Sequence, residues 1–322
     1  MVVVAHVERP DHTDRWGLAA SLGDAPRPGS VRQLAPVGEG IAPAQEPPIF
    51  GGMSHHNALP ASIPAELHEE LARAIAAALA AGAVIARMPV GEIREKSGPR
   101  DIVTAVDGAA ERAALEALAL RPGESLCAEE SAPGPVAMGR TWTIDPLDGT
   151  LNFAHGLPFY GPAVALCLDG DPIVAATFDP TRGDLFIAAK GGGAYLLRDG
   201  EAPRRLAPSG HAASRGLWYA GLWNGGDALT GEKILAAGHT IRSFGASAIG
   251  LAMVAAGRME AYVQAGHLWP WDVTGGVLLC REAGMTVRHT DLRAPDGVIR
   301  IVATDPELDA LGDEIAADLG IR

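Results

Sequence analysis

The chain has 322 residues, of which 48% are hydrophobic and 20% charged, and its formal net charge at pH 7 is −13. These values suit a globular protein with a core, whereas a nucleic-acid-binding surface needs clustered Lys and Arg. The apolar runs are interrupted well before the ~20 residues that span a membrane. The start shows no basic segment followed by an apolar one, so no signal peptide is predicted. We therefore expect neither nucleic acid nor membrane among the partners.

The first 60 residues differ from the rest of the chain. They contain PRPGS, APVGEG and APAQEPP and have little periodic apolar pattern, which predicts a disordered or loosely attached leader. Met53 is a candidate for the true initiator, because the globular pattern begins shortly after it. After the leader we expect an N-terminal α+β subdomain over 61–206, which carries metal-binding loops, and a C-terminal αβ subdomain over 207–322.

Two helices are predicted next. The first runs from Pro64 to about Ile85, with Ser62 as its cap, and its apolar residues recur at every fourth position: Leu67, Leu71, Ile75 and Leu79. The second runs from about Asp107 to Leu118 and is entered from the apolar segment 101–104.

Short apolar runs separated by turn residues follow, and such short loops predict an antiparallel meander. The runs are Val164–Leu168, Ile173–Phe178, Leu185–Ala189 and Ala194–Leu197. Strands at 217–220, 260–264 and 299–304 then alternate with helices at 247–256, at 272–282 and from about Pro306. No internal repeat is seen, and the mixture predicts an α+β or layered αβ architecture.

The most informative segment is Asp145-Pro146-Leu147-Asp148-Gly149-Thr150, which follows an apolar strand. We expect the strand to end at Asp145, and Pro146 and Gly149 to form a tight turn that brings Asp148 back beside Asp145. Two carboxylates this close repel each other unless a cation lies between them, and Mg²⁺ is a hard ion that prefers oxygen ligands. If a helix begins after Gly149, its free N–H groups suit a phosphate. Taken alone, the segment also fits an ordinary surface turn.

Three other acidic positions follow apolar segments, and each has a structural alternative. Glu129 and Glu130 end a strand-like approach at 125–128, although such a pair is usually only solvated surface. Asp107 and Asp272 each stand where a helix begins, so capping is the alternative for both.

Four windows occur together in the order and approximate spacing of the inositol monophosphatase family. They are DIVTAVD (101–107), AEES (128–131), DPLDGTLNF (145–153) and PWDVTGGVLLCREAG (270–284). The resemblance covers about residues 62–318, and it implies the layered αβαβα sandwich shared with fructose-1,6-bisphosphatase. It also implies a homodimeric, Mg²⁺-dependent phosphatase with two or three ions per site. In this group the enzymes are often lithium-sensitive. The cytoplasmic location is expected on other grounds, because the three cysteines, Cys127, Cys167 and Cys280, are an odd and sparse set that fits a reducing compartment.

The resemblance implies the ligands of those ions. Glu129, Asp145 and the backbone carbonyl of Leu147 resemble the ligands of the first metal. Asp145, Asp148 and Asp272 resemble those of the second, with Asp145 bridging the two. Glu129 also resembles the residue that holds a weaker third ion through waters.

The resemblance also implies catalytic and phosphate-binding roles. Asp107 and Thr150 resemble the pair that deprotonates the attacking water, with Glu129 assisting through its metal. Gly149 and Thr150 resemble the backbone donors to the phosphate, and Lys96, in a mobile loop over 95–98, resembles the basic residue near it. Metal-activated water then hydrolyses a small phosphate monoester directly, and no Cys, His or Ser nucleophile is required.

The alcohol of the substrate is less well indicated. Gln264 stands where the family often has an acid that contacts the substrate's hydroxyls, and His267 and Trp269 add bulk near the rim or only pack the loop. Gly245 to Ala248 resemble a segment that lines the same pocket. Histidinol phosphate, fructose 1,6-bisphosphate, and nucleotide 3′-phosphates or NADP remain alternative substrates, and a scaffold role with secondary catalysis is the alternative outside enzymes.

Overall fold

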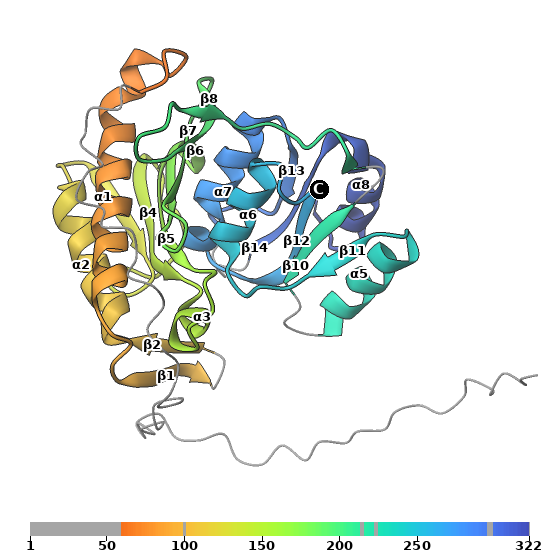
Figure 1. The fold of residues 1–322 in the computed structure, drawn as a ribbon, viewed down its shortest axis with the longest axis horizontal. Coiled ribbons are helices and arrows are strands. Elements are labelled where there is room, and N and C mark those ends of the chain that lie inside the picture. Colours follow the sequence, from red (N-terminus) through yellow and green to blue (C-terminus); the bar gives the residue numbers. More distant parts are fainter. Residues whose placement is uncertain (1–58, 99–100, 213–215, 222–224, 295–298, 322) are drawn as a thin grey trace, which may run out of the picture. The chain divides into compact units, whose positions relative to one another are not determined.

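The computed structural model describes residues 59–98, 101–212, 216–221, 225–294 and 299–321. Apart from its last two residues, the predicted leader lies outside this part of the chain, as does Met53. The described elements stack in five layers: α1 and α2, a seven-stranded sheet, α6 and α7, a five-stranded sheet, and then α5 and α8 (Figure 1). This arrangement confirms the predicted αβαβα sandwich.

The first layer contains the two predicted helices. A short 3-10 turn, η1 (Ala65–Leu67), leads into α1 (His68–Arg87), and α2 spans Ala105–Leu118. The predicted cap by Ser62 is wrong, because the 3-10 turn separates this residue from α1. Its hydroxyl instead donates to the carbonyl of Gly192 at 2.6 Å.

The large sheet has the strand order β3-β4-β5-β6-β7-β8-β9, and only β3 and β4 pair in parallel. The strands are β3 (Glu124–Ala128), β4 (Arg140–Asp148), β5 (Gly161–Leu168), β6 (Asp171–Asp179), β7 (Asp184–Ala189), β8 (Gly193–Leu197) and β9 (Arg204–Arg205). The antiparallel pairing of β5 to β8 confirms the meander. Alternate residues face opposite layers: Val164 and Leu166 pack towards α1, while Ala165 and Cys167 pack towards α6 and α7.

The small sheet has the strand order β11-β10-β12-β14-β13. Its strands are β10 (Leu217–Gly221), β11 (Thr240–Arg242), β12 (Ala261–Leu268), β13 (Thr286–His289) and β14 (Ile299–Thr304). Its helices are α5 (Gly225–Ala236), α6 (Ser247–Ala255), α7 (Pro270–Ala283) and, after the turn η2 (Pro306–Leu308), α8 (Asp309–Asp318). The sequence did not reveal β11, β13 or α5.

Close packing between α6 and α7 depends on a glycine. A Cβ atom on Gly276 would lie 2.4 Å from Leu251 Cδ1, so a larger residue would push the helices apart. These helices form the central layer and begin at the site described below. The predicted subdomains 61–206 and 207–322 remain a prediction, although each sheet draws its strands from only one of these ranges.

A hairpin precedes α2: β1 (Ile93–Gly98) pairs antiparallel with β2 (Asp101–Thr104). The prediction of a loop over 95–98 is therefore wrong, because main-chain pairing between Glu95 and Ile102 makes the segment a strand. Lys96 lies on this strand.

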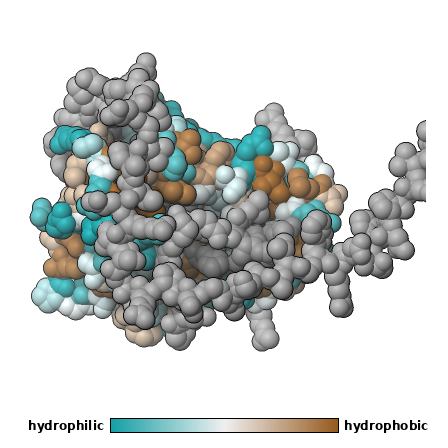
Figure 2. Space-filling model, turned by 90° about the horizontal axis from the view of Figure 1, so that it is seen from below, coloured by the Kyte–Doolittle hydropathy of each residue, from teal (hydrophilic) through white to brown (hydrophobic). Residues whose placement is uncertain are grey.

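On the face drawn in Figure 2, hydrophilic and hydrophobic residues intermingle wherever described residues are visible. Within the described residues, no helix combines the length and the apolar character needed to cross a membrane.

Candidate active site

A bulge in β4 brings Asp145 and Asp148 to the same edge of the sheet. Asp145 pairs with Ala163 and Asp148 with Gly161, so β4 carries one residue more than β5 over this stretch. An extra residue returns the side chain at i+3 to the face of residue i, and Pro146, which lacks an N–H, suits such an interruption. The strand thus continues to Asp148, and the prediction that it ends at Asp145 in a turn is wrong.

A short helix, α3 (Thr150–Ala154), follows immediately, as predicted. Gly149 caps it with a φ of 86°. A Cβ here would lie 3.0 Å from both Ala246 Cβ and the carbonyl oxygen of Phe159, so space and backbone conformation both require glycine. The free N–H groups of the first turn point out of the helix beside Asp148.

Asp107 caps the start of α2 and also links this helix to Thr150 at the start of α3. Its Oδ2 accepts hydrogen bonds from the backbone N–H and hydroxyl of Thr104, at 2.8 and 2.6 Å. Its Oδ1 accepts from the hydroxyl of Thr150 at 2.7 Å. The fully buried carboxylate is thus fixed on one side and aimed through Thr150 at the pocket. Capping and contact with Thr150 therefore coexist.

Asp148 and Asp272 lie at the first turns of the two central helices. Asp148 accepts from the N–H groups of Ser247 (2.8 Å) and Ile249 (3.1 Å) in α6. Asp272 accepts from the N–H of Trp269 at 2.7 Å, at the start of α7. Since helix N-termini carry partial positive charge, both carboxylates are attracted to these positions.

Glu129 comes from the end of β3 and is paired with a cation of the chain. The ammonium of Lys96 lies 2.7 Å from Glu129 Oε1 and 2.5 Å from Glu130 Oε1. The N–H of Glu130 donates to the buried Glu111 at 2.9 Å, which fixes this turn. Lys96 thus already neutralises part of the acidic edge.

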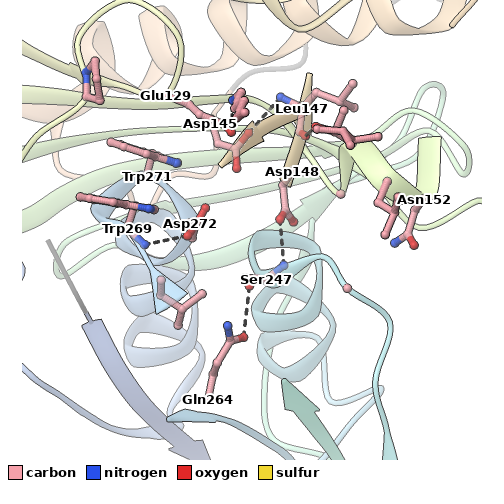
Figure 3. Close-up of a pocket in the computed structure, with 18 of the residues that line it drawn as sticks. Glu129, Asp145, Leu147, Asp148, Asn152, Ser247, Gln264, Trp269, Trp271 and Asp272 are labelled. Atoms are coloured by element: carbon pink, nitrogen blue, oxygen red, sulfur yellow. Dashed lines mark hydrogen bonds and ion pairs between the residues drawn. The ribbon is translucent and has the colours of Figure 1, made fainter. Parts of the chain in front are cut away.

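These elements surround a cavity of about 440 Å³, which is large enough for a small molecule. It includes nine residues that the sequence predicts as ligands or contacts: Lys96, Glu129, Asp145, Leu147, Asp148, Gly149, Thr150, Gln264 and Asp272. In Figure 3, Asp145, Leu147 and Asp148 descend from the large sheet, Asp272 and Ser247 rise from the two central helices, and Gln264 lies below. Asp107 does not line the cavity and reaches it through Thr150.

Burial makes ionisation of these carboxylates unfavourable. Desolvation raises the pKa of Asp145 well above its usual range, and the charges of Glu129, Asp148 and Asp272 raise it further. Desolvation also raises the pKa of Asp272 well above its usual range, although the hydrogen bond from the N–H of Trp269 lowers it in part.

Two of the acids titrate near neutrality. Desolvation raises the pKa of Glu129 to about 7 despite the opposing charge of Lys96. It also raises the pKa of Asp148 to about 7, against the hydrogen bonds from α6. Four buried or half-buried carboxylates with raised pKa values in one cavity are a sign of a functional site, because a stable core rarely retains them.

The donor set fits a hard divalent cation. Carboxylate oxygens, together with the carbonyl of Leu147 in the cavity wall, are the groups that Mg²⁺ prefers. A bound cation would relieve the repulsion that raises the pKa values. Within the described residues, no three His, Cys, Asp or Glu side chains lie close enough together to hold a metal ion as they stand. The carboxylates line the same cavity, but they are not gathered around one point.

The sequence profile of the inositol monophosphatase family matches residues 66–318. The chain belongs to this family.

An inositol-1-monophosphatase of Mycobacterium leprae is 34% identical over 235 residues, which is 69% of this chain and 80% of that protein. One of Caulobacter vibrioides is 37% identical over 219 residues, or 62% of this chain and 82% of that one. An inositol monophosphatase structure from Anabaena (Nostoc) sp. has a TM-score of 0.64 at 32% identity and covers 79% of this chain and 96% of that chain. As a member of this Mg²⁺-dependent family, the chain is a phosphoric monoester hydrolase.

Gln264 differs from its prediction in one respect. Gln264 lines the cavity as predicted, but the residue is only 3% exposed. Its Oε1 accepts from the hydroxyl of Tyr262 at 2.7 Å, and its Nε2 donates to the carbonyl of Gly266 at 3.2 Å. The amide is therefore largely committed to the protein.

The predicted rim is only partly described. Gly245 and Ser247 line the cavity as expected, and Trp269 lines it as well. The side chain of His267 lies outside the described part of the chain.

Asn152 and Tyr219 also line the cavity and were not predicted. Asn152 is in the conspicuous window 145–153, which offered a signal, and its Nδ2 bonds the carbonyls of Phe159 (2.8 Å) and Phe244 (2.5 Å). The hydroxyl of Tyr219 accepts from the N–H of Ala246 at 2.9 Å, a contact between distant segments that no local pattern announces.

Proposed function

We propose that this cavity hydrolyses a small phosphate monoester by direct attack of water, with two or three Mg²⁺ ions bound by the acidic cluster. The observation that carries the proposal is the convergence of four carboxylates with raised pKa values beside the hydrogen bond from Thr150 to Asp107. A core without a cation to bind would be destabilised by such a cluster.

The metal ligands proposed are those implied by the family. Glu129, Asp145 and the carbonyl of Leu147 would hold one ion, and Asp145, Asp148 and Asp272 would hold another. Glu129 would also help to hold a weaker third ion. Bound Mg²⁺ would supply charge neutralisation for the phosphate and would lower the pKa of water. Once occupied, the acidic cavity no longer repels a phosphate dianion.

The chain itself provides the route for the proton of the attacking water. The hydroxyl of Thr150 donates to Asp107 Oδ1 at 2.7 Å and lies 3.0 Å from the carbonyl of Leu147. A carboxylate is a stronger acceptor than a carbonyl, so we assign the hydroxyl proton of Thr150 to Asp107, which leaves Thr150 Oγ1 able to accept a hydrogen bond from water. Thr150 can then accept a proton from water as it passes its own to Asp107, which Thr104 holds in place.

The phosphate is oriented by the N–H groups of Gly149 and Thr150 at the turn after β4, and by the ammonium of Lys96. Lys96 lies on the strand beside Glu129 and carries its charge to the cavity wall. No covalent intermediate is needed. Burial raises the pKa values of Cys127, Cys167 and Cys280 to about 12, so these thiols stay protonated and are poor nucleophiles.

The relatives in Mycobacterium leprae and Caulobacter vibrioides are inositol-1-monophosphatases, which supports inositol monophosphate as a first substrate to test. Histidinol phosphate, fructose 1,6-bisphosphate, nucleotide 3′-phosphates and NADP are the alternatives. A homodimer is proposed from the family alone, and a cytoplasmic location from the odd and sparse set of cysteines. A scaffold role is less favoured, since a scaffold does not need the complete acidic set.

The experiment is release of inorganic phosphate from a panel of phosphate monoesters, with Mg²⁺ and with EDTA. Asp145→Asn keeps the shape and the hydrogen bond from the N–H of Leu147, yet removes the charge shared by two metal sites. We expect it to be inactive. Asp318→Asn, an exposed carboxylate on α8, serves as the matched control and should match the wild type. Equal activity of Asp145→Asn and wild type would refute the proposed function.

A further inference from the structure

A stacked aromatic pair, of which one ring is exposed, forms part of the wall of this cavity. The rings of Trp269 and Trp271 stack with centroids 5.3 Å apart and planes at 9°. Trp271 is 5% exposed, whereas Trp269 is 42% exposed although it lines the cavity. In Figure 3 the two indoles lie parallel on one side of Asp272, and Asp148 and Asn152 lie on the other. One face of Trp269 is thus covered by Trp271, and the residue still offers surface to a ligand.

The backbone fixes this aromatic pair in place. Between Gln264 and Leu268, β12 carries two residues more than its partner β14, since the paired residues are Ile301 and Ile299. Gly266 in this bulge has a φ of 152°, which favours glycine. The chain then enters α7 at Pro270, and the N–H of Trp269 donates to Asp272. A ring held between a bulge and a helix start loses little entropy when a ligand stacks on it.

The polar side chains of the cavity outside the acidic cluster are already bonded within the protein. Asn152 donates to two carbonyl groups. Ser247 lies 3.4 Å from Gln264 Oε1, the same atom that accepts from Tyr262. One N–H of the Gln264 side-chain amide donates to the carbonyl of Gly266. Among the described side chains, these bonds leave fewer groups to bond the hydroxyls of a polyol, and a hydroxyl that loses water without a partner weakens binding.

The rest of the wall is apolar. Besides the two indoles it contains Ile102, Pro133, Leu151 and Leu268. Leu151 is 39% exposed, so this part of the wall also offers apolar surface. An apolar wall with one stacking ring suits a flat, hydroxyl-poor group.

We propose that Trp269 determines specificity: it stacks on the alcohol part of the substrate, and the enzyme prefers phosphate monoesters whose alcohol carries a flat aromatic ring over those of polyols. This inference rests on the proposed function, because it concerns the alcohol of the ester hydrolysed there. It differs from the expectation that Gln264 selects the substrate by contacting its hydroxyl groups.

The test compares three esters of primary alcohols with similar leaving groups: 2-phenylethyl phosphate, its saturated analogue 2-cyclohexylethyl phosphate, and glycerol 1-phosphate. With Mg²⁺ we expect kcat/KM to be highest for the phenyl ester, about five- to tenfold above the cyclohexyl ester. Binding without turnover is measured by calorimetry in the Asp145→Asn protein, where the phenyl ester should also bind more tightly.

Variants separate stacking from packing. Trp269→Leu should reduce the ratio of phenyl to cyclohexyl efficiency to near one, and Trp269→Phe should restore much of it. Leu235→Ala, an exposed apolar residue on α5, is the matched control and should leave the ratio unchanged. If glycerol 1-phosphate is hydrolysed as efficiently as the phenyl ester, or if Trp269→Leu keeps the ratio, the inference is wrong and the proposed function stands. If Mg²⁺ supports hydrolysis of inositol monophosphate but of none of these esters, the inference is wrong and the proposed function stands. If it supports hydrolysis of none of the four, both fail.

Discussion

The acidic cavity predicts that Mg²⁺ stabilises the fold strongly at neutral and alkaline pH and weakly in mild acid. Folding raises the pKa of Asp148 from its ordinary 3.8 to about 7, and that of Glu129 from 4.5 to about 7. Between these limits the folded protein binds more protons than the unfolded chain. The free energy of unfolding of the metal-free protein must therefore fall as the pH rises through this window, and the contribution of these two acids levels off above their folded-state pKa.

The magnitude follows from the size of the two shifts. One pKa unit corresponds to about 1.4 kcal/mol, so each acid alone destabilises the ionised, metal-free fold by about 3–4 kcal/mol. The two acids share one site and their contributions do not add fully. If Mg²⁺ relieves about 3 kcal/mol, the melting temperature should rise by about 6 °C near pH 8, and by about 2 °C or less near pH 5.5.

The assay is thermal unfolding of the protein in EDTA and in about 10 mM MgCl₂, at both pH values. NaCl at matched ionic strength controls for general screening, since screening acts on all surface charges. Asp145→Asn should melt at a higher temperature than wild type in EDTA and respond less to Mg²⁺, because one of the mutually repelling charges is gone. A Mg²⁺-induced shift of the same size at both pH values, or none at all, would refute the electrostatic reasoning.

Three other predictions concern single side chains. Thr150→Val keeps the shape of the side chain but removes the hydroxyl that donates to Asp107. Phosphate release should fall about 10²- to 10³-fold, and the melting temperature should fall by a few degrees because a buried carboxylate oxygen loses its donor. Thr150→Ser should retain most activity, and a fully active Val variant would exclude the proton route. Lys96→Gln removes the ammonium beside Glu129, so thermal unfolding in EDTA should occur at a lower temperature. The rise in melting temperature on adding Mg²⁺ should then be larger, and an unchanged rise would show that Lys96 does not compete with the metal. Gly82→Ala would place a Cβ 2.3 Å from Phe178 Cδ1, so urea unfolding should report a loss of about 1–3 kcal/mol, and an unchanged midpoint would contradict the tight packing of α1 on β6.

The acidic residues could be predicted from the sequence because their signals are local. Asp145 and Asp148 are separated by two residues at the end of an apolar strand, and Asp272 begins an apolar helix. Short strands and periodic helices predicted an α+β or layered αβ architecture, whereas the αβαβα order was implied by the family resemblance. The family windows then assembled these separate signals into one site.

Features that depend on pairing between distant segments could not be predicted in this way. The continuation of β4 to Asp148 depends on Gly161 of β5 as a partner, which no property of the Pro-Gly segment reveals. Lys96 was assigned to a loop because its pairing strand was not apparent. Gln264 was expected to face the substrate, but Tyr262, two residues earlier on the same strand, already occupies its carboxamide oxygen. In each case the competing partner comes from the packed fold.

Three acids of the site, Asp107, Asp148 and Asp272, also hold the first turns of α2, α6 and α7. The backbone of each helix thus serves as a permanent counter-charge that remains when the ions leave. The positions of these three carboxylates therefore do not depend on bound ions alone, because each is tethered to the start of a helix. It follows that an alanine at any of the three would confuse folding with chemistry. An amide keeps the tether cleanly only at Asp272, because both carboxylate oxygens of Asp107 and of Asp148 accept hydrogen bonds.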